Sequence, residues 1–225
     1  LICDMDRAFP FEAYEKAAKL GFHSLLVPEA DGGDGGDVFS YALLCEALSC
    51  YGVDFSVAIA GGIFTAMNLS LHGTEDQKQR FLKPFMRGEI RFPISMSEPN
   101  AGSDVANVQT RAERVGDDYV VNGQKLWCSG ASNRGAVILM LVRTANTPDK
   151  RDGLSVLIVP NIRGPLSMAS QLRGGQQLLM DLIDDPAFAA DLFAFCAEVG
   201  VVFAAALVRA GGHAIMLGDA LASPN

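Results

Sequence analysis

The chain has 225 residues, 49% of them apolar, so it is long and apolar enough to fold around a buried core as one large domain or two modest ones. Its 18 basic and 26 acidic residues give a formal net charge of −8, without a run of Lys or Arg. This composition argues against a disordered chain and against a nucleic acid as partner. An anionic cofactor remains compatible with it, because local backbone amides can hold a phosphate.

The cysteines predict a reducing compartment. They are scattered and lack a CxxC spacing, so we expect reduced core residues of a cytoplasmic protein, without a disulfide framework or a metal site. The five are Cys3, Cys45, Cys50, Cys128 and Cys196.

The apolar pattern predicts neither a signal peptide nor a membrane span. The N-terminus is acidic and lacks the basic-then-apolar order of a signal peptide. It also lacks an initiator Met, so we expect the chain to begin inside a longer one. The longest apolar stretch, residues 199–208, is shorter than the roughly 20 residues that cross a bilayer, and it predicts a core helix.

Residues 1–90 predict a helical domain. An amphipathic helix over residues 11–20 ends at Gly21, which suits a helix C-cap. The glycine-rich residues 25–37 lack a phosphate-binding GxxxxGK[ST] pattern and predict a plain connecting loop. Asp37 then caps a second helix.

Two further helices are expected before residue 90. Asp54 opens a helix that is apolar on nearly every face, so we expect it to be buried. Thr74 and Gln77 have the spacing of a capping box in front of the next helix.

From residue 91 the apolar period changes from that of a helix to that of a strand. Asn122 and Gly123 predict a hairpin turn. A middle β domain is therefore expected over residues 91–162. Its strands are expected within residues 91–97, 105–116, 117–130, 135–144 and 153–160.

Residues 163–225 have a different pattern, in which helical residues follow a strand and lead to another strand. Asp185 and Pro186 suit the N-cap and first position of a long helix, and a buried strand is expected within residues 213–220. The predicted fold class is α+β mixed: an N-terminal helical domain, a β-barrel-like middle domain, and an α/β segment resembling part of a TIM barrel.

The sequence SEPNAGSD, residues 97–104, suits a ligand-binding loop. Pro99 fixes a backbone angle, and Gly102 lets a flat or phosphorylated ligand approach closely. Glu98 and Asp104 have two interpretations. They could form a catalytic acid pair, but we favour a structural role, in which Glu98 orders the turn and Asp104 caps the returning strand.

A second candidate segment is KLWCSG, residues 125–130, which we expect to be a strand. Alternation along it would place the Trp127 ring and the Ser129 hydroxyl on one face, where they suit a planar heteroaromatic cofactor. A single Trp is also a common core residue, and this alternative stays open.

Residues 11–160, and these two segments above all, resemble the acyl-CoA dehydrogenase family. The resemblance implies an FAD-dependent oxidoreductase that acts on a CH–CH bond by α,β-dehydrogenation of an acyl-CoA thioester. FAD would lie between the β domain and a C-terminal four-helix domain. Electron-transfer flavoprotein or a similar acceptor, a homo-oligomer and a place in fatty acid metabolism are implied as well.

The resemblance also implies roles by position. Met96 and Ser97 would contact the isoalloxazine ring. Gly102 and Ser103 would line the loop beside FAD and the pantetheine–phosphate part of the acyl-CoA, with Ser103 as a substrate-binding residue.

Three further positions belong to the implied cofactor site. Trp127 would pack against the flavin, Ser129 would donate near its N5, and Cys128 stands where relatives have an apolar residue and would be passive. The catalytic base would come from the C-terminal helical domain, which we expect this chain to lack, so we expect it to be inactive as isolated.

Residues 164–225 resemble instead an internal piece of the uroporphyrinogen decarboxylase superfamily, which includes cobalamin-dependent methyltransferases. The motifs are GPLSMASQL, DDP and GDALASP. Asp219 would be a ligand contact or a loop-ordering residue, and His213 a structural one. The family fold is a (β/α)8 barrel, of which this segment would supply a small part.

The two resemblances meet near residues 161–164. A natural fusion, an assembly artefact and an engineered join would each produce this arrangement. We expect exposed apolar edges, marginal stability and association. The alternatives to a dehydrogenase-like protein are a decarboxylase or methyltransferase, and an inactive fused or truncated chain.

Overall fold

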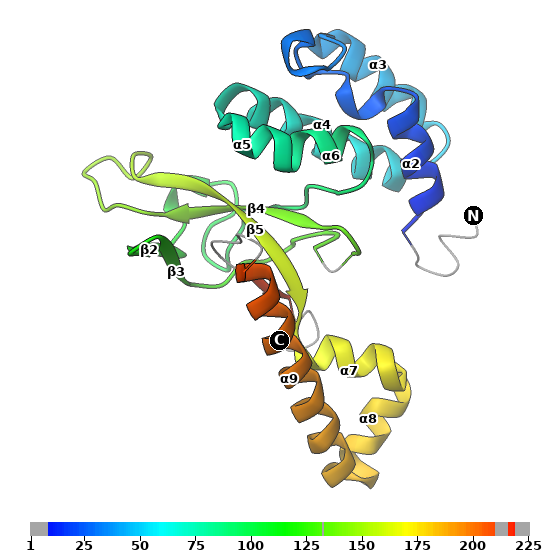
Figure 1. Ribbon diagram of the computed structural model, residues 1–225, viewed down its shortest axis with the longest axis vertical. Coiled ribbons are helices and arrows are strands. Elements are labelled where there is room, and N and C mark those ends of the chain that lie inside the picture. Colours follow the sequence, from blue (N-terminus) through cyan, green and yellow to red (C-terminus); the bar gives the residue numbers. More distant parts are fainter. Residues whose placement is uncertain (1–8, 132, 210–215, 219–225) are drawn as a thin grey trace. The chain divides into compact units, whose positions relative to one another are not determined.

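The computed structural model describes residues 9–131, 133–209 and 216–218 (Figure 1). The chain divides into two compact units. The first unit contains residues 1–94 and 133–139, and the second contains residues 95–132 and 140–225.

The first unit is helical, as the sequence predicts. The Asp37 carboxylate accepts from Ser40 N at 2.8 Å and so caps the second helix as predicted. The capping box is also confirmed, because Thr74 and Gln77 exchange hydrogen bonds of 3.0 and 3.2 Å. The helices are α2 (Phe11–Lys19), α3 (Val38–Ser49), α4 (Val53–His72), α5 (Glu75–Gln77) and α6 (Lys83–Met86), with a π-helical turn at Lys78–Leu82.

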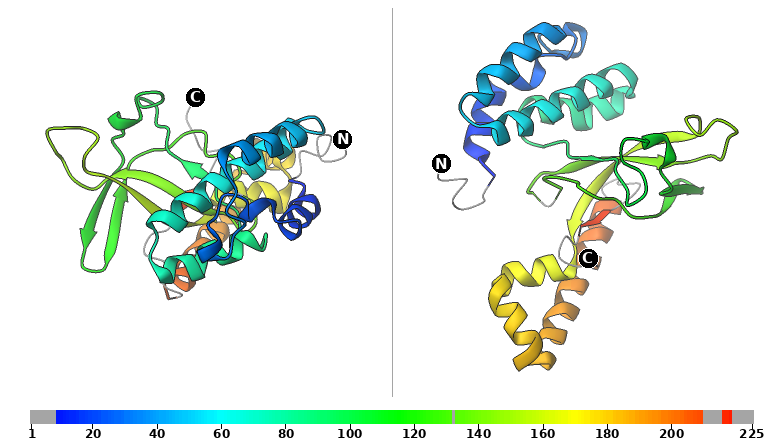
Figure 2. Two further views of the ribbon diagram at one scale, coloured as in Figure 1. Left: turned by 90° about the horizontal axis from the view of Figure 1, so that it is seen from above. Right: turned by 180° about the vertical axis from the view of Figure 1, so that it is seen from behind.

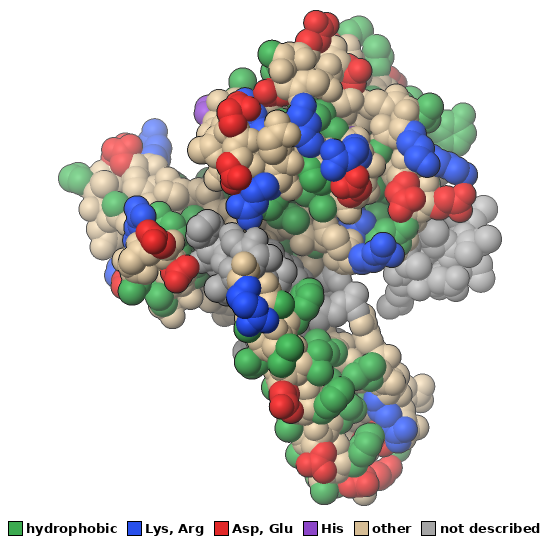
Figure 3. Space-filling view, in the orientation of Figure 1, with side chains coloured by type: hydrophobic (Ala, Val, Ile, Leu, Met, Phe, Trp, Pro, Cys, Tyr) green, Lys and Arg blue, Asp and Glu red, His purple; other side chains and the backbone are tan. Residues whose placement is uncertain are grey.

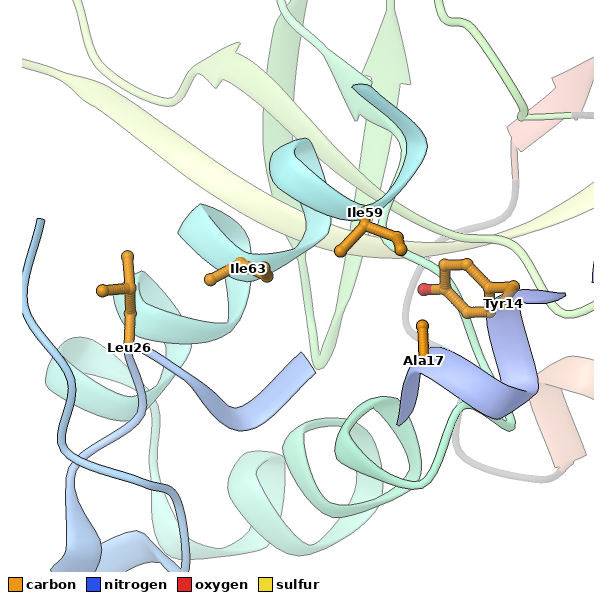
Figure 4. Close-up of a cluster of buried hydrophobic side chains, with 5 residues drawn as sticks. All are labelled: Tyr14, Ala17, Leu26, Ile59 and Ile63. Carbon is orange, nitrogen blue, oxygen red and sulfur yellow. The ribbon is translucent and has the colours of Figure 1, made fainter. Parts of the chain in front are cut away.

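The core of this unit lies between α2, α4 and the loop after α2. Figure 4 shows Tyr14 and Ala17 of α2 facing Ile59 and Ile63 of α4, with Leu26 of the loop completing the cluster. All five side chains are buried, and the Leu and Ile side chains each contribute roughly 1.5–3 kcal/mol through removal of apolar surface from water.

The expectation that the helix after Asp54 is buried throughout is wrong. Asp54 lies in the first turn of α4, and the helix buries one face, which includes Ile59 and Ile63. Its other face exposes apolar side chains such as Val57 and Leu71, at 66% and 60%. Burial depends on the neighbouring elements, and those that pack against α4 leave part of its surface open.

The strands belong to one mixed sheet, and each of the five strand segments predicted between residues 91 and 160 contains a strand, although the part over residues 125–130 does not. The strand order is β3-β2-β4-β5-β6, with β1 pairing with β4. Figure 1 labels the strands from β2 to β5. The strands are β1 (Ile94–Ser95), β2 (Arg111–Val115), β3 (Asp118–Asn122), β4 (Val137–Arg143), β5 (Leu154–Arg163) and β6 (Met216–Gly218).

The predicted hairpin turn at Asn122 and Gly123 is wrong. In the β2–β3 hairpin Val115 pairs with Asp118, so the chain turns at Gly116, whose φ is +65°. Asn122 is the last residue of β3 and pairs with Arg111. The strand register overrode the turn preference of the Asn-Gly dipeptide.

Three helices connect β5 to β6, which pair in parallel, as the strand–helix–strand pattern predicts. The Asp185 cap is confirmed, because its carboxylate accepts from Phe188 N at 3.1 Å. Figure 2 shows α7 and α8 on one side of α9, where Ala169, Leu178 and Cys196 form a small core. The bounds are α7 (Pro165–Arg173), α8 (Gly175–Asp184) and α9 (Pro186–Arg209).

The prediction that residues 199–208 form a core helix is wrong for the part that the structure describes. Val201, Val202 and Phe203 are 69%, 63% and 53% exposed, and Figure 3 shows apolar side chains spread over α9. By length and composition alone, α4 and residues 186–206 are each long and apolar enough to cross a membrane, a test that core helices of soluble proteins also pass.

Some predicted features lie outside the described residues, namely Cys3, His213 and Asp219. The cysteines inside the described residues are free thiols. The prediction that they are core residues is wrong for Cys50, which is exposed, and Cys196 alone is fully buried among them.

Candidate functional site

Two loops of the second unit carry the candidate site residues, and they lie side by side. The first loop is residues 96–104, and the second is residues 123–131. Leu126 N donates to Ser97 O at 2.8 Å, and Lys125 Nζ donates to Met96 O at 3.0 Å. Met96 and Ser97 are thereby brought next to the segment that carries Trp127.

Glu98 holds the first loop in place. Its carboxylate is buried and accepts from Gln109 N at 2.6 Å, Thr110 N at 2.9 Å and Lys125 Nζ at 2.8 Å. Burial raises the pKa of Glu98, but these hydrogen bonds outweigh it and lower the pKa to about 2. Glu98 is therefore ionised and structural at neutral pH, as we favoured from the sequence.

The turn after Glu98 leaves its tip open. Glu98 and Ala101 exchange backbone hydrogen bonds of 2.9 and 3.2 Å across the turn. Gly102 and Ser103 follow and are exposed, and a Cβ added to Gly102 would meet no atom within 4 Å. The fold itself thus leaves free space beside Gly102, which an approaching ligand could use.

The predicted capping role of Asp104 is wrong. Its carboxylate pairs with Lys150 Nζ at 2.7 and 2.9 Å, and both side chains are about half exposed, at 58% and 53%. The chain after Asp104 forms a 3₁₀ turn, Val105–Asn107, whose N-terminus has no side-chain cap.

The predicted strand over residues 125–130 is wrong, and so is the alternation argument for Trp127 and Ser129. Trp127 has φ +59°, which is strained for a residue with a Cβ, and Ser129 N donates to Trp127 O at 2.8 Å in a tight turn. The indole is 84% exposed, so the alternative that Trp127 is a core residue is also excluded.

Cys128 lies half-buried beside the buried Ser95. Burial raises the pKa of the Cys128 thiol, and the neighbouring Ser95 hydroxyl offsets part of the change. A protonated thiol is a poor nucleophile and a poor metal ligand. In the described part of the chain, no three His, Cys, Asp or Glu residues gather as a metal site would need.

Lys125 is the residue that the sequence reasoning missed. It is one of six Lys residues and belongs to no catalytic pattern, so only its place in KLWCSG, two residues before Trp127, could have drawn notice. In the structure its Nζ donates to Met96 O and to the Glu98 carboxylate, and so joins the two loops together with the Leu126–Ser97 backbone hydrogen bond.

Comparison with known proteins identifies the family. The model of the acyl-CoA dehydrogenase N-terminal domain matches residues 2–89, and that of the acyl-CoA dehydrogenase middle domain matches residues 94–175. The model of uroporphyrinogen decarboxylase matches residues 138–225, so two families overlap on residues 138–175. Over residues 2–175 the chain belongs to the acyl-CoA dehydrogenase family.

Individual relatives agree with this family. A probable acyl-CoA dehydrogenase of Bacillus subtilis is 38% identical over 171 residues, which are 74% of this chain and 44% of that protein. Subunit CarC of the caffeyl-CoA reductase–Etf complex of Acetobacterium woodii is 36% identical over 129 residues, which are 55% of this chain and 33% of that protein.

A solved structure of an acyl-CoA dehydrogenase also resembles this chain. The acyl-CoA dehydrogenase of Geobacillus kaustophilus matches with a TM-score of 0.59 at 31% identity, and the match covers 68% of this chain and 40% of that chain. The present chain thus spans less than half the length of these relatives.

Proposed function

We propose that this chain carries part of an FAD-dependent acyl-CoA dehydrogenase site, for the α,β-dehydrogenation of an acyl-CoA thioester. The observation that carries the proposal is the pairing of loop 96–104 with loop 123–131, with an exposed Trp127 at their edge, in a chain of this family. FAD, when bound, supplies the acceptor for a hydride.

The residues present fit a flavin. The exposed indole of Trp127 offers a face for stacking on a planar ring. In our proposal Met96 packs on the ring, and Ser97 and Ser129 donate to its polar edge. Cys128 is a passive neighbour, because its thiol stays protonated.

The open tip of the first loop suits the substrate and the phosphate-bearing parts of the ligands. Gly102 leaves its backbone accessible, and the exposed hydroxyl of Ser103 is a free polar group beside it. We propose that Gly102 contacts FAD and that Ser103 contacts both FAD and the pantetheine–phosphate arm of the acyl-CoA.

Removal of the substrate α-proton needs a base, and the two loops hold two carboxylates, Glu98 and Asp104, of which Asp104 is paired with Lys150. Glu98 is excluded, because its carboxylate is fully engaged and its pKa of about 2 makes it a very weak base. We propose that the base comes from outside this part of the fold, and that the isolated chain binds ligand without turnover.

We propose three functional segments: residues 1–90, residues 91–162 and residues 163–225. The ends of the two dehydrogenase matches, at residues 89 and 94, support the first boundary. The uroporphyrinogen decarboxylase match and the parallel pair β5–β6 support an α/β segment like part of a TIM barrel, joined near residues 161–164. Turnover of a tetrapyrrole or a methyl-corrinoid would favour the alternative function, a decarboxylase or methyltransferase.

We propose a cytoplasmic protein that associates with itself and passes electrons to electron-transfer flavoprotein or a similar acceptor. The relationship to an Etf-complex subunit supports the acceptor. The exposed apolar side chains of α4 and α9, such as Phe64 and Phe195, support association.

The test is a titration of the purified chain with FAD. We expect a yellow protein with a flavin absorbance band, and quenching of the emission of Trp127, the single tryptophan of the chain. Bleaching of the bound flavin by an acyl-CoA would demonstrate turnover and so exclude an inactive chain. A protein that stays colourless with added FAD would contradict the proposed function.

A further inference from the structure

A buried cation, the ammonium group of Lys125, makes two of the contacts between the two site loops. Lys125 Nζ donates to Glu98 Oε1 at 2.8 Å and to Met96 O at 3.0 Å. The side chains of Lys125 and Glu98 are 3% and 6% exposed, the lowest exposure of any ion pair among the described residues. A second Lys–carboxylate pair of the same unit, Lys150 with Asp104, is about half exposed.

The Glu98 carboxylate extends this contact to a third segment. It accepts from the backbone amides of Gln109 and Thr110, just before β2 begins. One carboxylate thus fixes loop 96–104, the approach to β2, and Lys125 of loop 123–131 relative to one another. Hydrogen bonds to a charged group are directional and strong, so this arrangement selects one register between the loops.

The backbone next to Lys125 carries this register to the position of Trp127, the second residue after Lys125. Leu126, next to Lys125, donates its N–H to Ser97 O at 2.8 Å, and Trp127 follows at φ +59°. Such a backbone angle persists only where the surrounding contacts determine it. The Lys125 contacts and the Leu126 bond hold this segment against the first loop.

We propose that Lys125 and Glu98 are positioning residues, whose ion pair sets the register in which Ser97 and Trp127 together face a flavin. The role rests on the proposed function, because the ligand named is that of the dehydrogenase site. Neither residue touches the ligand in this proposal, and both act through the loops that they join.

The single Trp gives a direct readout of this positioning, with or without ligand. Lys125→Met removes the buried cation at similar length, and Lys150→Met removes the exposed one as a matched control. Fluorescence anisotropy and quenching report the mobility of Trp127, an FAD titration reports affinity, and far-UV circular dichroism reports the fold.

For Lys125→Met we expect a retained fold, a more mobile Trp127 and an FAD affinity lower by about tenfold or more, because bonds to a charged partner are lost. For Lys150→Met we expect the mobility of Trp127 and the FAD affinity to stay within about twofold of the wild type, because an exposed ion pair contributes little free energy. Lys125→Arg can still donate to Glu98 and should recover part of the loss.

A folded Lys125→Met protein with the Trp127 mobility and FAD affinity of the control would overturn the proposal. If Lys125→Met does not fold, the double variant Glu98→Gln/Lys125→Met, which removes both charges, takes its place. Should that variant also fail to fold, the pair supports the fold as a whole and the positioning role is overturned. If the wild type binds no FAD, the proposed function fails, and the mobility of Trp127 still decides the positioning role.

Discussion

Two buried ionisable side chains, in two regions of the molecule, respond to burial in opposite ways. In the site loops, Glu98 accepts from Lys125 and two backbone amides and stays charged. In the helical unit, His23 is fully buried, with its ring 4.3 Å from that of Tyr14 and 5.1 Å from that of Phe85. Neither ring nitrogen of His23 has a hydrogen-bond partner in the described structure, and burial lowers its pKa to about 4.

The comparison shows that the neighbours, and not burial alone, decide the charge of a buried group. Aromatic neighbours keep His23 neutral inside an apolar core. Charged and amide partners keep Glu98 ionised, and they also order the loops that carry the candidate site. The predictions that follow test this difference.

Replacement of Glu98 should have the largest effect. Glu98→Gln leaves Lys125 as an uncompensated buried charge, which we expect to cost about 3 kcal/mol of the free energy of unfolding in urea. Asp104→Asn, which breaks the half-exposed pair with Lys150, is the control and should cost less than about 1 kcal/mol. Equal losses of unfolding free energy in the two variants would show that burial of the Glu98–Lys125 pair does not affect its contribution to stability.

His23 and Glu98 should each lose their contribution to stability in a different pH range as the solution is acidified. The folded-state pKa of His23 lies below its usual value of 6.5, so its stabilising contribution is complete above pH 6.5. It is lost as pH falls toward 4, by up to about 3 kcal/mol. The contribution of Glu98 is complete above pH 4.5 and is lost only as pH falls toward 2.

The matched variant for this window is His23→Leu, which has no group to titrate. The difference in unfolding free energy between wild type and His23→Leu, followed by circular dichroism, should fall between pH 6.5 and 4. A difference that is constant across this range would rule out a neutral buried His23.

Changes at Trp127 should separate stability from binding. Trp127→Gly relieves the positive φ and should raise stability by about 1 kcal/mol, while Trp127→Ala should change it by less than about 0.5 kcal/mol. Both should weaken FAD binding by about tenfold through loss of the stacking face. Unchanged FAD affinity in both variants would show that Trp127 does not contribute to FAD binding.

The smallest effect on stability is expected on the exposed face of the C-terminal helices. Val202→Ser and Ile183→Ser replace side chains that are 63% and 78% exposed, and each should change stability by less than about 0.5 kcal/mol. Light scattering should show weaker association of the double variant. Ala169→Ser, inside the small core of these helices, should lower stability more than either exposed variant does. A smaller loss for Ala169→Ser than for the exposed variants would contradict the burial pattern.

The local signals in the sequence predicted the ends of helices well. Asp37, Thr74 and Asp185 cap their helices as expected, because a cap depends on a few neighbouring residues of the same chain segment. The Asn122–Gly123 turn failed because strand register, a contact between distant segments, fixed the turn elsewhere. The burial of α4 and α9 also failed, because an apolar face is buried only where another element meets it.

Local pattern and motif were sufficient to predict the family, most of the helices and strands, and the loop that carries SEPNAGSD. Three roles became visible only in the folded chain: Glu98 is an ionised anchor, Asp104 pairs with Lys150, and Lys125 of one site loop contacts the other. Each of these roles depends on a partner at least 27 positions away along the chain, and no local pattern encodes such a contact.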